Sequence, residues 1–191
     1  MVESEQQAQL EGPEKEPSCV NDQIIPDLLT KEQKDMIKDF TIRETYFDGN
    51  QEDDHSQFPH CVIKNEKLNG IDAKERAKRF EALIKLLARS HCICPSNEVM
   101  KSCAFALTGI GFKALEPKPV YWNPEKVDIL LFVCQKFYNS GERSATTDFK
   151  TALEVFHVSE NSQKLSNKSA EGSKVNDAYF GKDFNKIYPE L

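Results

Sequence analysis

Long hydrophobic runs are missing from this sequence of 191 residues. The longest apolar stretch, residues 129–134, is far shorter than the about 20 apolar residues of a membrane-spanning helix. The first 20 residues have neither the basic start and apolar centre of a secretory signal nor the arginine-rich, acid-poor composition of a mitochondrial transit peptide. We therefore expect a cytoplasmic and/or nuclear protein that does not bind membranes, with its six cysteines as reduced thiols.

Catalytic and nucleotide-binding signatures are also missing. The sequence has no G-x-S-x-G and no H-E-x-x-H, and Gly109-Ile110-Gly111 lacks the third glycine and the Lys-Ser/Thr of a phosphate-binding loop. The acidic segment 48–54 lacks the glycine and glutamate that a calcium loop starting at Asp48 would need at its sixth and twelfth positions. We predict a protein that is not an enzyme, needs no cofactor and takes no small-molecule substrate.

Apolar residues make up only 39% of the chain, and the mean hydropathy is −0.58, which indicates one packed domain with polar segments around it. Residues 1–59 carry 15 acidic and 5 basic side chains, whereas the chain that follows is mildly basic. We predict a disordered acidic leader over 1–23, a helical domain over 24–158, a flexible linker over 159–177 and an aromatic tail over 178–191.

Helical periodicity dominates the predicted domain, which indicates an all-α fold, a small bundle of about five helices. Four helices have a start signal in the sequence: the capping box of Thr30 and Gln33, Asp72 with Glu75, Ser96, and Asn123 with Pro124. The first helix is predicted to run to about Arg43.

The fourth helix, about 124–139, is apolar nearly all round, so we predict that it lies at the centre of the domain. A fifth helix is predicted over about 147–158. Strand signals are scarce: 61–63 and 119–121 could be short extended pieces, but the turns that a sheet needs are missing.

Cysteine and histidine cluster at two places in the sequence. His60, Cys61, Cys92 and Cys94 could supply four ligands to zinc, although their spacing is not that of paired zinc ligands. The alternative is that Cys92 is a small buried residue, as are Cys103 and Cys134. We favour the second interpretation and predict no metal.

Basic residues gather on the second predicted helix, at Lys74, Arg76, Lys78, Arg79, Lys85 and Arg89. Helices that bind nucleic acid usually belong to strongly basic domains, whereas the pI of this chain is about 5.3. We therefore interpret the basic side chains as a solvated helix face, and nucleic acid is not the partner that we expect.

The C-terminal part of the chain consists of the polar segment 159–177 followed by the segment 178–191, which is rich in large apolar residues. We predict that it binds a partner through Tyr179, Phe180, Phe184, Ile187 and Tyr188 or packs back onto its own domain, and the second interpretation is slightly favoured. The sequence thus predicts a non-enzymatic helical protein-interaction module or adaptor in a regulatory complex, with other proteins as partners. The alternative is a zinc-stabilised or nucleic-acid-associated regulatory domain.

Overall fold

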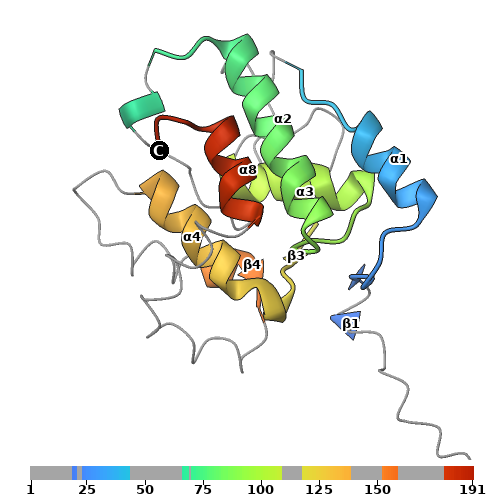
Figure 1. Cartoon of the computed structure of the whole chain (residues 1–191). Coiled ribbons are helices and arrows are strands. Elements are labelled where there is room, and N and C mark those ends of the chain that lie inside the picture. Colours follow the sequence, from blue (N-terminus) through green and yellow to red (C-terminus); the bar gives the residue numbers. More distant parts are fainter. Residues whose placement is uncertain are drawn as a thin grey trace, which may run out of the picture.

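The structure is a computed structural model of the chain, and it describes residues 19–20, 23–43, 66–68, 70–108, 118–138, 152–158 and 179–191 (Figure 1). Most of the predicted leader and the whole of the predicted linker lie outside these residues. The same holds for the acidic segment 48–54, for Gly109-Ile110-Gly111 and for the extended piece predicted at 61–63.

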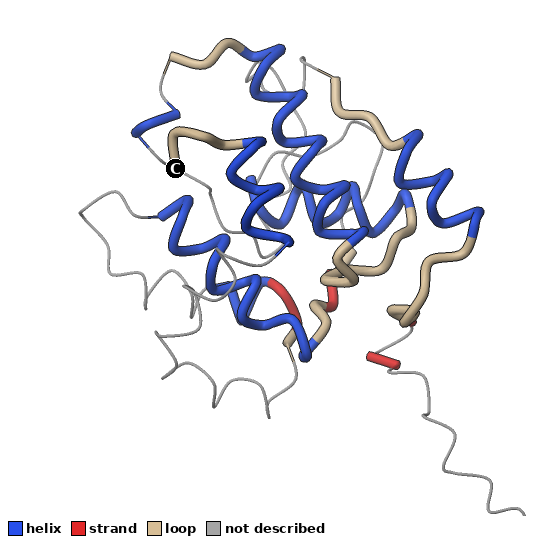
Figure 2. The backbone as a smooth tube through the Cα atoms, viewed as in Figure 1, coloured by secondary structure: helices blue, strands red, loops and turns tan. Residues whose placement is uncertain are grey.

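Helices make up most of the described chain, so the fold is mainly α, and the all-α prediction is confirmed to that extent (Figure 2). The helices are α1 Lys31–Asp39, α2 Ala73–Arg89, α3 Asn97–Thr108, α4 Val127–Tyr138 and α8 Tyr179–Ile187, with short 3-10 turns η2 Glu66–Leu68 and η3 Pro124–Lys126. The strands are β1 Cys19–Val20, β2 Gln23–Ile24, β3 Val120–Tyr121 and β4 Phe156–His157.

The predicted helix starts are confirmed by side-chain caps. Thr30 Oγ1 accepts a hydrogen bond from the Gln33 amide at 3.2 Å, and Gln33 Oε1 accepts one from the Thr30 amide at 2.8 Å, which completes the capping box. The corresponding caps of the later helices are Asp72 on Glu75 N, Ser96 on Val99 N and Asn123 on Glu125 N. Each cap satisfies an amide that the first helical turn would leave without a partner.

The first helix is shorter than predicted, because α1 ends at Asp39 and Phe40 has extended backbone (φ −61°, ψ 129°). Phe40 and Ile42 are both buried, and the Ile42 amide donates to Glu81 Oε2 on α2 at 2.9 Å. Extended backbone turns these two side chains into the core.

The fourth helix is enclosed, as its composition predicts. Its first turn, η3, is 3-10, and from Val127 the chain is α-helical. Apolar residues all around α4 are buried: Val127, Ile129, Leu130, Leu131, Phe132, Val133, Cys134 and Phe137. Trp122, just before the cap, is also buried, and its Nε1 donates to the Lys126 carbonyl at 2.8 Å.

The prediction that the fifth helix continues to residue 158 is wrong. Residues 152–155 are helical, but Phe156 and His157 form β4, which pairs in parallel with β3 in the register Val120↔Phe156 and Tyr121↔His157. The Phe156 ring lies edge-on to Trp122, with ring centroids 5.3 Å apart, and aromatic and β-branched residues suit a strand. Parallel strands are joined by a long crossover, here through α4, so no local turn signals the pair.

A second strand pair lies at the start of the described chain. β1 and β2 pair antiparallel, with Cys19 opposite Ile24 and Val20 opposite Gln23. β1 lies inside the segment 1–23 that we predicted to be disordered, and the rest of that segment, apart from Gln23, lies outside the described residues.

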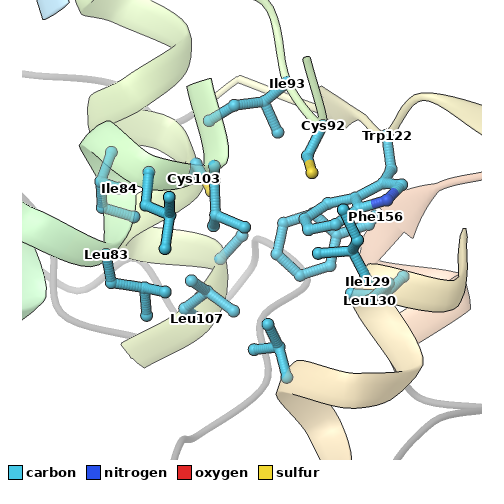
Figure 3. Close-up of a cluster of buried hydrophobic side chains, with 14 of the residues drawn as sticks. Leu83, Ile84, Cys92, Ile93, Cys103, Leu107, Trp122, Ile129, Leu130 and Phe156 are labelled. Atoms are coloured by element: carbon cyan, nitrogen blue, oxygen red, sulfur yellow. The ribbon is translucent and has the colours of Figure 1, made fainter. Parts of the chain in front are cut away.

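The packing of the helices determines where the candidate site lies. α2 contacts α1, α3 and α8, and α8 lies between α2 and α4 (Figures 1 and 2). Leu83 and Ile84 of α2, Leu107 of α3 and Leu130 of α4 meet in one buried cluster (Figure 3).

Candidate functional site

The residues predicted to bind a partner lie on α8 or, for Tyr188, directly after it, and their side chains differ in exposure. Phe180, Phe184 and Tyr188 are buried against the rest of the chain, while Ile187 is partly buried. Tyr179 differs, since 78% of it is exposed. The structure thus brings three of the five residues together on the inner face, and their binding to a partner stays a prediction.

An aromatic cluster holds α8 to α4. The Phe184 ring lies 5.2 Å from that of Phe132 and 5.7 Å from that of Phe137, and Tyr188 lies 5.0 Å from Phe137. All three pairs are edge-to-face, with interplanar angles of 80–83°. This geometry places the positive edge of one ring on the negative face of the next, which stabilises the pair beyond the apolar area it buries.

Polar contacts connect the residues after α8, Glu190 and Leu191, with α2 and α4. Arg79 of α2 donates from Nη1 to both carboxylate oxygens of Glu190, at 2.8 and 2.9 Å, and from Nε to Glu75 at 2.8 Å. The hydrogen bond from Arg79 lowers the pKa of Glu190. Lys136 of α4 donates to the Leu191 carbonyl at 3.0 Å.

A groove lies where α8 begins, between it, α1 and the end of α2. It has a volume of about 440 Å³, and it is lined by Leu29, Lys34, Ile37, Leu86, Arg89, Ser90, Tyr179 and Asp183. Apolar side chains from three segments form part of its wall, while Lys34, Arg89 and Asp183 add charge. The hydrogen bond from Lys186 to Asp183, at 2.6 Å, lowers the pKa of Asp183, and the charge of Arg89 acts in the same direction.

Two large apolar side chains of the N-terminal described segment, which also supplies the lining residue Leu29, are exposed. Leu28, next to the lining residue Leu29, is 83% exposed, and Ile24 in the same N-terminal segment is 52% exposed. With Tyr179 they are the exposed large hydrophobic residues of the described chain. Neither Ile24 nor Leu28 was among the residues predicted to bind a partner. The signal in the sequence was a pair of apolar doublets, 24–25 and 28–29; in each, the second residue is buried or half-buried and the first is exposed.

Two members of the alternative zinc set, Cys92 and Cys94, are described, and they lie in or near the core. Cys92 is fully buried, with its sulfur pointing toward the Trp122 ring (Figure 3), and burial raises the pKa of its thiol. Cys94 is half-buried, and desolvation raises its pKa too. Zinc binds the thiolate, which both environments disfavour.

The other two members, His60 and Cys61, lie outside the described residues, so the zinc alternative stays untested. Within the described ranges, no three His, Cys, Asp or Glu residues lie close enough to hold a metal ion. Cys92, Cys103 and Cys134 are buried in the core, as predicted.

The basic side chains of α2 are partly neutralised by neighbours. Arg79 pairs with Glu75 and Glu190, and Lys85 donates to Glu81 Oε1 at 2.7 Å and to the Lys38 carbonyl at 3.0 Å. These two residues therefore serve contacts within the chain, which reduces the charge that α2 could offer to phosphate.

Among the described residues, no helix is both long and apolar enough to cross a membrane. Comparison of the chain with protein-family models, with curated proteins and with solved structures finds no match.

Proposed function

We propose that this protein is a non-enzymatic helical protein-interaction module, an adaptor in a regulatory complex, and that its partner docks at the groove between α1, α2 and α8. The observation that carries the proposal is the exposure of Tyr179, which lines that groove, and of Leu28, which precedes the lining residue Leu29. Single exposed apolar residues are ordinary on protein surfaces, but apolar residues gathered at a concave site are typical of interaction surfaces.

The groove also indicates what kind of partner it suits. The walls at Ile37 and Leu86 favour an apolar side chain, and the basic groups of Lys34 and Arg89 favour a carboxylate beside it. Asp183 also lines the groove, and its carboxylate accepts a hydrogen bond from Lys186 at 2.6 Å. A protein segment with an apolar residue next to an acidic one therefore fits this site.

The test is recovery of partners by affinity purification and mass spectrometry, comparing the full chain with the double variant Leu28→Ser, Tyr179→Ser. We expect the variant to lose a protein that the parent recovers, and to melt at the same temperature, because both side chains are exposed. The matched control is Lys74→Ser with Glu125→Ser, two exposed positions away from the groove. Recovery of the same proteins by the parent and the Leu28, Tyr179 variant contradicts the proposal.

A further inference from the structure

We infer that the groove between α1, α2 and α8 binds a second copy of this chain, which inserts its exposed Leu28. In the same contact, Asp27 of the inserting copy pairs with the basic groups of Lys34 and Arg89 in the groove. The inference rests on the proposed function, because it takes the groove as a docking site, and it deepens that function by naming an occupant.

The chain itself carries a segment of the kind that suits the groove, an apolar residue next to an acidic one. Leu28, which is 83% exposed, directly follows Asp27, which is exposed too, and the chain bends at these two residues. Ile25 before the bend is buried, and Leu29 after it packs against the core. The bend is therefore held at both ends, so little conformational entropy is lost when it docks.

The charges of the bend and of the groove are complementary. Among the described residues, no carboxylate lies within ion-pair distance of Lys34 or Arg89, and no basic group lies within that distance of Asp27. Asp183, the acidic residue of the groove, already accepts a hydrogen bond from Lys186. The groove thus offers two basic groups to a carboxylate, and the bend supplies one.

The position of the bend allows a closed, symmetric pair. Leu29, which directly follows Leu28, lines the groove, so the bend and the groove are neighbours on each copy. In a pair related by a two-fold axis, the bend of each copy can meet the groove of the other, and both contacts form at once. A contact made only of a bend and a groove on each copy is small, so we expect a weak dimer.

Sedimentation of the full chain over a range of concentrations tests the inference, with the charge-reversal variants Asp27→Lys and Lys34→Glu. Both positions are exposed, so each variant should melt close to the parent. We expect the parent to dimerise with a dissociation constant below ~1 mM. Either variant alone should weaken the dimer about tenfold or more, because it places like charges opposite each other.

An equimolar mixture of the two variants tests whether these positions meet. In a mixed pair, the lysine introduced at position 27 of one copy faces the glutamate introduced at position 34 of the other, and the second contact pairs Asp27 with Lys34 as in the parent. We expect the mixture to recover dimers that neither variant forms alone. The matched control is Lys74→Glu, an equal change of charge at an exposed position outside the groove, which should dimerise like the parent.

The variant Leu28→Ser tests the apolar part of the contact, and it should also weaken the dimer. Three results overturn the inference. One is a parent chain that stays monomeric up to ~1 mM, the weak limit of useful affinity. Another is a dimer that Asp27→Lys and Leu28→Ser leave unchanged, which would place the contact on a different surface. The third is a mixture of the two charge variants that forms no more dimer than either variant alone.

The recovery of proteins other than this chain separates the inference from the proposed function. A monomeric parent that loses such a protein in the variant Leu28→Ser with Tyr179→Ser contradicts only the inference. Dimers that respond to the charge variants as expected, together with recovery of the same other proteins by the parent and that double variant, contradict only the proposed function.

Discussion

His91 follows the C-cap residue of α2, Ser90, and has left-handed backbone with φ 58°, where glycine is usual. The Cys92 amide donates to the Leu87 carbonyl at 3.0 Å and the His91 amide to that of Ala88 at 3.1 Å, which together make a Schellman motif. The Nδ1 atom of His91 is buried and has no hydrogen-bond partner. The Cβ of His91 therefore lies in a backbone conformation that disfavours side chains. In addition, the buried Nδ1 atom forms no hydrogen bond that would offset its loss of contact with water.

We expect His91→Gly to raise the free energy of unfolding by about 1 kcal/mol, because glycine has no Cβ to strain at positive φ. That corresponds to roughly 2–4 °C in melting temperature for a chain of this size. The control His91→Ala removes the unpaired Nδ1 atom but keeps the Cβ. Equal melting temperatures for the two variants, measured by calorimetry, would show that the backbone at His91 is not strained.

At the scale of elements, we predict that the hydrophobic core depends on α4. Leu130 is fully buried, so Leu130→Asp places a carboxylate where no described contact can compensate its charge. We expect the cooperative thermal transition, followed by circular dichroism, to disappear. The control Gln135→Glu adds a carboxylate to the same helix at a half-exposed position and should melt close to the parent. A Leu130→Asp variant that melts normally would show that α4 is not central.

Helix positions could be predicted because their signals are local. The caps at Thr30, Asp72, Ser96 and Asn123 each depend on residues within three positions in the sequence. The pairing of β3 with β4 could not be predicted, since each strand has two residues and its partner lies across α4. For the same reason the aromatic face of α8 was visible in the sequence, whereas the rings that receive it were not.

For the whole molecule, buried thiol and phenol groups that stay protonated in the folded chain predict a loss of stability at alkaline pH. Burial raises the pKa of Cys92 and of Tyr188 above their ordinary values of 9.0 and 10.0, and desolvation does the same to a smaller extent for half-buried Cys94. The unfolded chain therefore releases protons above about pH 9 that the folded chain retains. Stability is complete below the ordinary values and falls as the pH rises above them, by up to about 1.4 kcal/mol per pH unit for each group.

The measurement is urea unfolding under reducing conditions from pH 7 to 11, with Tyr188→Phe as the matched variant. We expect a shallower decline above pH 10 in the variant, because it no longer has the phenol that the folded chain keeps protonated. An unfolding free energy that stays constant over this range, or a decline that Tyr188→Phe leaves unchanged, contradicts the expectation. The lowered pKa of Glu190 acts at the acid end, where the exposure of this side chain keeps the effect small.

The pairing of β3 with β4 across α4 has a consequence for the order of folding. Contacts of α2 with α1 and α3 join neighbouring elements, whereas β3 with β4, and α2 with α8, join segments far apart along the chain. Closing a long loop costs chain entropy before the new contacts repay it, so distant pairings slow folding. We expect α2 and α3 to associate first and the strand pair later. Until the strand pair forms, the apolar surface of α4 can contact other partly folded chains. Aggregation during refolding should therefore compete with formation of the strand pair.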